Sequence, residues 1–203
     1  MKIFEQARAP NPRRVRIFLA EKGIEMAYEQ VSLADLEHKT EQFTSLNPFR
    51  AVPVLVLDDD TVIAESMAIC RYFEDLQPEP RLMGATPLEK ATIEMWARRV
   101  ELELLYRVAQ CFRHLHPAMA ELEKPQVPDW GEANRPRVLA TLKILDEVLQ
   151  SRDYLAGDRY SVADITALVA IDFMKPARIE RPTELKALAR WYEAVAARPS
   201  AKA

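Results

Sequence analysis

The chain has 203 residues, of which 49% are hydrophobic and 29% charged, and its net charge is -3. That length suffices for one large domain or two small ones with a packed core. Acidic and basic residues are interspersed, which argues against a nucleic-acid-binding surface, so we expect small-molecule or protein partners. No stretch approaches about 18 consecutive apolar residues, and the N-terminus has no apolar signal core, so we expect no membrane partner and a cytoplasmic location.

The two cysteines, Cys70 and Cys111, lie in separate helix-like segments. Their separation does not match the spacing of a metal or redox site. We therefore interpret both as reduced, small core residues and predict no metal centre.

The first third of the chain alternates strand and helix patterns. A strand over residues 2–6, a helix over 13–22 that ends at Gly23, and a strand over 26–33 form a βαβ unit with parallel strands. Two apolar runs around an acidic turn in residues 52–64 are typical of a hairpin, and apolar spacing over 66–76 predicts a helix. The order βαβ then ββα predicts an α/β domain over residues 1–77.

The composition changes over residues 78–86, where Pro78, Pro80 and Gly84 indicate a linker. The pattern over 87–203 is helical, with a long helix over 88–115, a crossover over 117–133 and a later helix whose apolar face is Val138, Leu142, Leu145 and Leu149. These helices predict an all-α bundle, with a frayed end over 197–203. Ser161 and Asp164 resemble a capping box before an apolar helix.

The stretch ARAPNPRRVRIF, residues 7–18, has the sequence pattern of the turn that carries the thiols in a thiol redox protein. A strand leads into it and an arginine-rich helix pattern leaves it. Where a redox enzyme carries C-x-x-C, this chain has Ala9-Pro10-Asn11-Pro12. Without a cysteine no mixed disulfide forms here, so a reductase function is disfavoured.

Two further positions have the chemistry to bind a peptide. If the Val52-Pro53 bond is cis, the N–H and C=O of Val52 face outward and can pair with an extended peptide; a trans proline would merely start a strand. Glu65 and Ser66 begin the helix over 66–76, where free N–H groups and the helix dipole favour a carboxylate. The alternative is that Glu65 or Ser66 simply caps its own helix.

Together, in their order and spacing, these motifs resemble the cytosolic glutathione transferases of bacterial type. The resemblance covers essentially the whole chain, including the loop HKTEQFTSLNPFRAVPVLVLDD, the helix AESMAICRYF and the segment YLAGDRYSVADITALVAI. It implies a thioredoxin-like N-terminal domain that binds glutathione as co-substrate, followed by an all-α domain that lines a pocket for an apolar electrophile. It also implies a homodimer formed through the helix after Glu65 and the long helix over 88–115.

The resemblance also implies roles for individual residues. The cysteinyl backbone of glutathione would pair with Val52 ahead of a cis Pro53, and the γ-glutamyl carboxylate would meet Glu65 and Ser66. His38 would bind the glycine carboxylate, with Lys39 and Arg50 nearby; alternatively, His38 is an ordinary exposed loop histidine.

The sequence departs from the family at the residue that activates the thiol. Many relatives stabilise the thiolate with a Ser, Tyr or Cys, and the position that matches the Ser or Cys is Ala9, whose methyl group donates no hydrogen bond. Asn11 is our candidate donor, together with backbone N–H groups and the positive helix end beside Arg13 and Arg14. The alternative is that Asn11 is present for its turn preference.

The long helix supplies candidates for the electrophile pocket. Its apolar face is expected to consist of Met95, Leu102, Leu105 and Phe112, with Arg99 and Tyr106 at its edge. Arg99 and Tyr106 would contact the substrate or, alternatively, face solvent. Because Ala9 supplies no donor, a non-catalytic glutathione-binding or regulatory protein on the same fold is the rival to a transferase.

Overall fold

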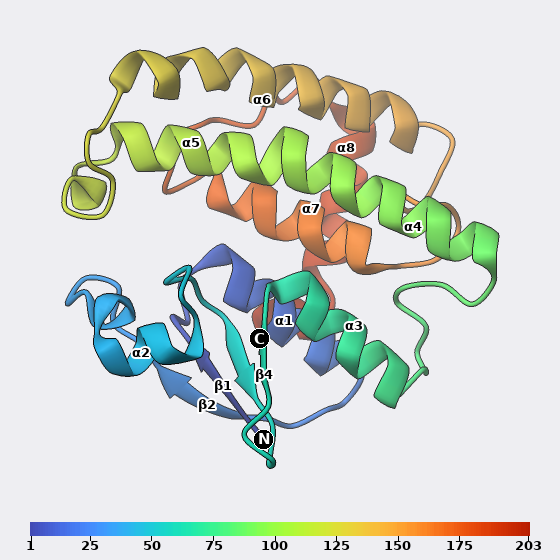
Figure 1. Ribbon diagram of the computed structural model, residues 1–203. Coiled ribbons are helices and arrows are strands. Elements are labelled where there is room, and N and C mark those ends of the chain that lie inside the picture. Colours follow the sequence, from blue (N-terminus) through green and yellow to red (C-terminus); the bar gives the residue numbers. More distant parts are fainter. The chain divides into compact units, whose positions relative to one another are not determined.

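The computed structural model describes residues 1–203 and divides the chain into two compact units (Figure 1). The first is Met1–Leu82 with Pro199–Ala203, and the second is Met83–Arg198. We expected residues 87–203 to form one domain with a frayed end, and the structure corrects this. Pro199–Lys202 is a 3₁₀ helix with Ser200 and Ala201 buried, and Arg13 of the first unit donates a hydrogen bond to the Ala201 carbonyl at 3.0 Å. This contact assigns the last residues to the first unit.

The first unit contains a four-stranded mixed sheet. Its strands are β1 (Lys2–Glu5), β2 (Ala27–Gln30), β3 (Val54–Val56) and β4 (Val62–Ala64), in the order β2-β1-β3-β4. Strand β1 pairs parallel with β2 and antiparallel with β3, and β3 pairs antiparallel with β4. The expected βαβ and ββα halves and the thioredoxin-like fold are therefore confirmed.

Three helices cover this sheet (Figure 1). They are α1 (Pro10–Glu21), α2 (Glu41–Leu46) and α3 (Ser66–Leu76). Alternation along the strands sends Phe4 and Val54 to the face where Phe43 of α2 packs, and sends Ile3 and Leu55, both fully buried, to the opposite face. Helix α1 begins at Pro10, earlier than expected, because proline is well suited to a helical position whose N–H has no partner.

The second unit is all helical. It consists of α4 (Pro87–Val100), α5 (Tyr106–Leu115), α6 (Pro128–Leu149), α7 (Val162–Phe173) and α8 (Lys186–Ala196). The predicted apolar face of α6 is buried, and Ser161 and Asp164 form the expected capping box of α7. Helix α6 begins within the expected crossover, since Pro128 occupies its first turn. No helix is long and apolar enough to cross a membrane.

The long helix changes its buried face at a π-helical segment, Glu101–Leu105, which joins α4 to α5. Before it Trp96 and Val100 are buried, within it Leu104 and Leu105 are buried, and after it Val108 is buried. The wider turn shifts the helical phase, so the stripe expected from regular spacing is wrong in part. Met95 and Leu102 are 40% and 45% exposed.

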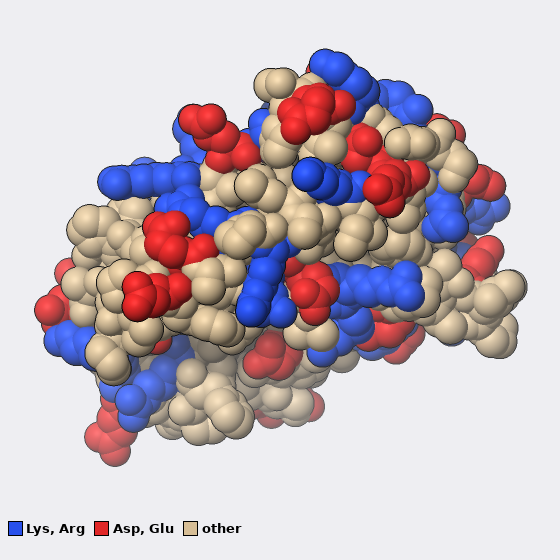
Figure 2. All heavy atoms as spheres, turned by 90° about the horizontal axis from the view of Figure 1, so that it is seen from above, with Lys and Arg blue, Asp and Glu red and all other residues tan.

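The molecular surface carries charges of both signs. On the face drawn in Figure 2, basic and acidic side chains are interspersed. That distribution matches the expectation from composition.

Candidate functional site

The sheet register brings the predicted peptide-binding segments to one end of the first unit. Phe4 of β1 pairs with Val54 of β3, and Val54 pairs with Ala64 of β4. The turn after β1, the Val52-Pro53 segment before β3 and Glu65 after β4 therefore leave or enter the sheet at the same row. Ala9, Val52 and Glu65 therefore lie at the same end of the sheet.

The turn before α1 presents very few backbone donors. The Ala9 N–H donates to the Gln6 carbonyl at 2.8 Å, and the Ala9 carbonyl accepts from the Arg13 N–H at 3.2 Å. Pro10 and Pro12 have no N–H. The Asn11 N–H is consequently the one open backbone donor in the first turn, where the sequence led us to expect several after Pro12. The exposed Asn11 side chain adds an amide with no hydrogen-bond partner in the chain.

The segment that enters β3 leaves a backbone peptide group available. The Val52-Pro53 bond is cis, and Pro53 is buried. Neither the N–H nor the C=O of Val52 has a hydrogen-bond partner within the chain. The preceding loop is held by Asn47, 2% exposed, whose Nδ2 donates to the Ala51 carbonyl at 2.8 Å. An open N–H and C=O on one residue can pair with both groups of an extended peptide.

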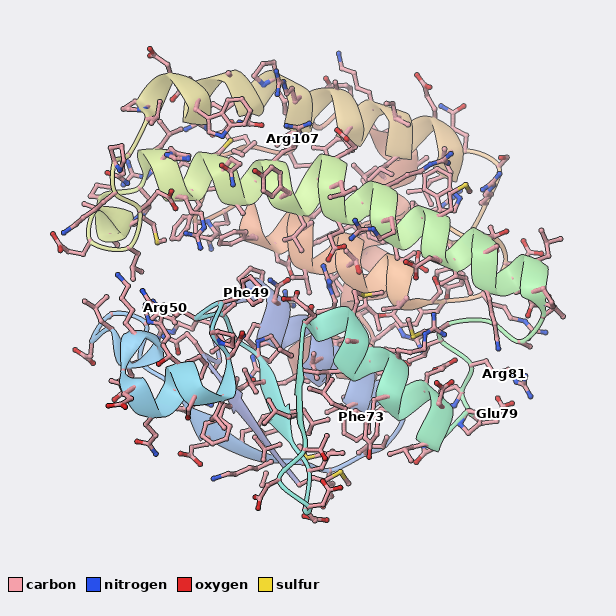
Figure 3. The ribbon with its side chains drawn as sticks, in the orientation of Figure 1. Phe49, Arg50, Phe73, Glu79, Arg81 and Arg107 are labelled. Carbon is pink, nitrogen blue, oxygen red and sulfur yellow. The ribbon has the colours of Figure 1, made fainter.

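Asn47 is a positioning residue that the sequence reasoning missed. Its Oδ1 also accepts from the Phe49 N–H at 3.0 Å, so one side chain closes the loop from both directions. Phe49 and Arg50 lie in this loop, and Phe49 is 85% exposed (Figure 3). The signal was present, because Asn followed by Pro favours a turn.

The N-terminus of α3 is not capped by its own side chains. Glu65 lies at the N-cap with φ 70° and ψ 118°, and no side chain accepts from the first-turn N–H groups. The first intrahelical bond runs from the Ile69 N–H to the Glu65 carbonyl at 3.0 Å. The self-capping alternative is therefore wrong, and the N–H groups of the first turn remain open to an anion. The left-handed φ of Glu65 costs about 1–3 kcal/mol, a strain that tends to occur at functional sites.

Ser66 is held by a buried arginine of α1. Arg14 is 0% exposed, and its Nη1 donates to the Ser66 hydroxyl at 3.1 Å, with Ser66 itself 5% exposed. This contact fixes the start of α3 against α1 and places a positive charge close to the anion-binding turn. We had considered Arg14 only as part of the positive helix end. Its spacing from Phe18 at i+4 and Ile17 at i+3 was the signal that it lies on the buried face.

His38 lies in a 3₁₀ helix, Glu37–Lys39, and is 7% exposed. The alternative that it is an exposed loop histidine is therefore wrong. Lys39 and Arg50 are exposed, and Arg50 has a left-handed φ of 56°. The two cations are available to a ligand carboxylate, while His38 is shielded from bulk water.

Neither cysteine supplies a nucleophile, which agrees with their interpretation as core residues in the sequence analysis. Both are free and buried. Burial, as the largest cause, raises the pKa of the Cys70 thiol to about 12. Burial also raises the pKa of Cys111, whose thiol donates to the Gly131 carbonyl at 3.3 Å. Neither thiol is ionised at neutral pH, and a thiol group is reactive as the thiolate.

Arg99 and Tyr106 are both exposed on the long helix of the second unit. Tyr106 is 47% exposed, and the Arg99 guanidinium lies 5.0 Å from the Trp96 ring centroid. They are thus available to solvent or ligand. Arg107, one residue on, instead connects α5 to α6, because its Nη1 donates to Asn134 Oδ1 at 3.3 Å (Figure 3).

Comparison with known proteins agrees with this arrangement. The family model described as "Glutathione S-transferase, N-terminal domain" matches residues 9–76, and that described as "Glutathione S-transferase, C-terminal domain" matches residues 113–199. The chain is 41% identical to Glutathione S-transferase 2 of Saccharomyces cerevisiae, an alignment that covers 100% of this chain and 88% of the relative.

Solved structures give the same result over the full length. The crystal structure of Gtt2 from Saccharomyces cerevisiae superposes with a TM-score of 0.96 at 41% identity, covering 100% of this chain and 99% of that one. A glutathione S-transferase domain-containing protein from Marinobacter aquaeolei VT8 superposes with a TM-score of 0.95 at 42% identity, covering 98% and 99%. The register, the open backbone groups and these matches show that the chain belongs to the glutathione transferase family.

Proposed function

We propose that the protein binds glutathione and joins its sulfur to a carbon atom of a small hydrophobic electrophile. One observation carries the proposal. The Val52 N–H and C=O, which have no partner in the chain, and the N-terminus of α3, which has no side-chain cap, lie at the same end of the sheet. In a substitution the thiol proton leaves, a sulfur–carbon bond forms and the leaving group departs with its electron pair. In an addition the substrate takes up a proton instead.

The tripeptide's backbone and carboxylates match the groups around this end of the sheet. The cysteinyl N–H and C=O pair with those of Val52, next to the cis Pro53. The γ-glutamyl carboxylate binds at the first turn of α3, beside Glu65 and Ser66. His38, with the exposed cations Lys39 and Arg50 as alternatives, binds the glycine carboxylate. Support comes from the open N–H groups and from the buried Arg14 that holds Ser66.

The thiolate is stabilised by Asn11 in place of the hydroxyl that Ala9 lacks. A free thiol has a pKa of about 8.5, and each unit of depression needs about 1.4 kcal/mol of preferential stabilisation of the anion. A hydrogen bond to a charged group contributes about 1.5–3 kcal/mol and a helix N-terminus about 0.3–1 kcal/mol. The Asn11 side-chain amide and N–H therefore suffice to lower the pKa by one to two units on these magnitudes.

The electrophile contacts the second unit in this proposal. Arg99 and Tyr106 are the candidate side chains, since both are exposed on the long helix. Replacement of either should change KM for the electrophile and leave the affinity for glutathione unaltered. A change in glutathione affinity instead would remove it from this role.

The thiol pKa in the complex tests the catalytic proposal. The ultraviolet absorbance of the thiolate is titrated against pH with wild type, Asn11→Ala and the control Gln42→Ala, an exposed position on α2. We expect a bound pKa below that of free glutathione, raised by one to two units in Asn11→Ala and unchanged in the control. A bound pKa equal to the free value would favour the non-catalytic rival, particularly if Ala9→Ser then created activity.

We also propose a homodimer formed through α3 and the α4–α5 helix. Large apolar side chains are exposed on these helices: Leu76 is 57% exposed, Leu88 76% and Leu102 45%. Light scattering should give twice the mass of the chain, and Leu102→Glu together with Leu76→Glu should give the single-chain mass. A wild type with the single-chain mass contradicts the dimer.

A further inference from the structure

The last residue of β1, Glu5, places inside the first unit a carboxyl group that the proposed mechanism does not use. Glu5 is 1% exposed and follows Phe4, a residue of the apolar core. Burial of a charged group is costly, and an apolar residue at such a position often gives equal or greater stability. The contacts of Glu5 instead indicate that it determines the geometry of the turn that follows β1.

Glu5 holds a different side chain with each of its two carboxylate oxygens. Its Oε1 accepts a hydrogen bond from Nε2 of Gln30, its register partner on β2, at 2.9 Å. Its Oε2 lies 3.7 Å from Nε of Arg16, a residue of α1. Both atoms of this ion pair are buried, so water does not separate them. The carboxylate therefore connects a side chain of β2 with a side chain of α1.

Gln30 and Arg16 in turn bind the two backbone groups of Ala7. The Ala7 N–H donates to Gln30 Oε1 at 3.0 Å, and the Ala7 carbonyl accepts from Arg16 Nη2 at 2.5 Å. The partners of the Gln30 amide settle its orientation, because a carboxylate only accepts and a backbone N–H only donates. The resulting closed ring, called the Ala7 ring below, consists of Glu5, Gln30, Ala7 and Arg16.

The Ala7 ring compensates for a missing helix cap. Ala9 is the N-cap of α1, and its methyl group accepts no hydrogen bond from the first helical turn. A Ser, Thr, Asp or Asn at this position would connect the turn to the helix directly. Here Arg16, on α1 itself, makes that connection through the Ala7 carbonyl, and Gln30 anchors the same residue to β2. The start of α1, which contains Asn11, is thus held through contacts at Ala7.

We propose that Arg16 and Gln30 are positioning residues for activation of the glutathione thiol. They act through Ala7, and the turn that they hold presents the side-chain amide and N–H of Asn11 to the sulfur in a fixed geometry. This inference rests on the proposed function, in which Asn11 stabilises the thiolate. Because the strength of a hydrogen bond depends on its distance and angle, a loosened turn weakens that stabilisation and raises the pKa of the bound thiol.

Ultraviolet titration of the glutathione complex tests the inference with Gln30→Met and Arg16→Lys. Gln30 is exposed, so its replacement leaves the core unaltered. Lysine keeps the charge of Arg16 but has one nitrogen in place of the two that contact Glu5 and Ala7. Each variant should raise the pKa of the bound thiol by about half a unit to one unit, which lowers the ratio of thiolate to thiol about three- to tenfold.

Calorimetry separates positioning of the thiolate from binding of the tripeptide. At about pH 5 the thiol is protonated in both free and bound glutathione, so the affinity does not depend on ionisation. Gln30→Met and Arg16→Lys should then bind glutathione within about twofold of the wild-type affinity, because Val52 and the N-terminus of α3 are unchanged. Urea denaturation of each variant is measured in parallel, and Gln30→Met alone carries the test if Arg16→Lys does not fold.

Two matched variants serve as controls. Gln42→Met makes the same substitution at an exposed position on α2 and should leave the pKa of the bound thiol unchanged. The double variant Glu5→Gln/Gln30→Glu exchanges amide and carboxylate and so closes the ring again. It should return the pKa to within about 0.3 unit of wild type, whereas Gln30→Glu alone, which sets two carboxylates against each other, should not. Tyr28 does not disturb the absorbance, because burial and, next, the charge of Glu5 raise its pKa above its usual value of 10.0.

Hydrogen exchange at the Ala7 N–H, measured without glutathione, reports on the ring itself and should be severalfold faster in Gln30→Met. Equal exchange in wild type and Gln30→Met would overturn the inference. So would a lowered wild-type pKa that both variants retain, an outcome that leaves the proposed function intact. A double variant that keeps the raised pKa of Gln30→Glu would also contradict positioning by the ring. A wild-type pKa equal to that of free glutathione would overturn both the inference and the catalytic proposal.

Discussion

Replacing Asp164 with alanine removes the acceptor for four hydrogen bonds in the second unit. Its Oδ1 accepts from the Leu155 N–H at 3.0 Å and the Trp191 indole N–H at 2.9 Å. Its Oδ2 accepts from the N–H and the hydroxyl of Ser161, both at 3.0 Å. Asp164 is 0% exposed and Trp191 1% exposed, so water cannot replace the lost acceptor.

The expected cost follows from these four bonds. Loss of the helix cap is worth about 0.5–2 kcal/mol. Each of the two other donors, on Leu155 and Trp191, costs about 1–3 kcal/mol when it stays buried without an acceptor. The variant no longer has to bury a carboxylate, which offsets part of the loss. We expect the free energy of unfolding to fall by about 2–4 kcal/mol, which lowers Tm by about 5–15 °C at this chain length.

Urea denaturation followed by circular dichroism measures the change, with Asp158→Ala as the control at an exposed aspartate. A double-mutant cycle of Asp164→Ala with Trp191→Phe isolates the indole bond and should give a coupling energy of about 1–3 kcal/mol. A loss below 1 kcal/mol for Asp164→Ala, or a coupling energy near zero, would refute the reasoning from buried donors.

The buried carboxyl group of Asp164 should also make the free energy of unfolding depend on pH. Burial, the largest cause, raises the pKa of Asp164 from 3.8 to about 6. The folded state therefore binds this proton more tightly than the unfolded state. The stabilising contribution of the proton is complete below about pH 4 and is lost as the pH rises through about 6. The stability of wild type relative to Asp164→Asn, which does not titrate, should fall by about 2–3 kcal/mol between pH 4 and pH 7. A constant difference contradicts the raised pKa.

Three further substitutions test the packing and the proposed site. Lys22→Met breaks the buried ion pair with Glu74, 2.7 Å, and should cost about 3–5 kcal/mol in urea denaturation, with Lys22→Met/Glu74→Leu less destabilised than the single variant. Gly131→Ala should cost about 1–3 kcal/mol by the same assay, since its Cβ would lie 2.6 Å from Leu115 Cγ; an unchanged midpoint contradicts this contact. Ser66→Ala should weaken glutathione binding about tenfold by calorimetry, and unaltered affinity removes Ser66 from the site.

Most of the fold was predictable from local patterns. The helix over 66–76 and the capping box at Ser161 were confirmed because apolar spacing and cap chemistry act within a few residues of chain. No helix was predicted from the sequence at Glu41–Leu46, where α2 lies, although Thr40 accepts a hydrogen bond from the Phe43 N–H and so caps it. A helix of one or two turns offers too little periodicity to detect.

The differences from expectation arise where long-range contacts decide. The π-helical segment at Glu101–Leu105 moves the buried face of the long helix, and a hydrophobic pattern with a constant period cannot anticipate that shift. The 3₁₀ helix at Pro199–Lys202 is fixed by Arg13, far away along the chain. The residues next to Pro199–Lys202 in the sequence give no indication that Arg13 contacts this segment.

The residues of the candidate site show the same difference between local patterns, which were predictable, and long-range contacts, which were not. The positions of Val52, Glu65 and Ser66 were predictable because nearby residues determine their backbone geometry. Pro53 follows Val52, and Glu65 and Ser66 lie at the start of a helix. The roles of Asn47 and Arg14 were not, because each depends on a contact between segments: Asn47 closes a loop, and Arg14 joins α1 to α3.

The dependence of the site on backbone groups explains how the chain can keep a glutathione-binding geometry with alanine at position 9. The open groups at Val52 and at the first turn of α3 are set by the sheet register and the helix start, neither of which involves the side chain of Ala9. We therefore propose that binding of the tripeptide and ionisation of its thiol are separable in this protein. In the proposed mechanism, ionisation of the thiol depends on the side-chain amide and N–H of Asn11, because Pro10 and Pro12 lack N–H groups. Under that proposal, Asn11 decides whether the protein is a transferase or only binds glutathione.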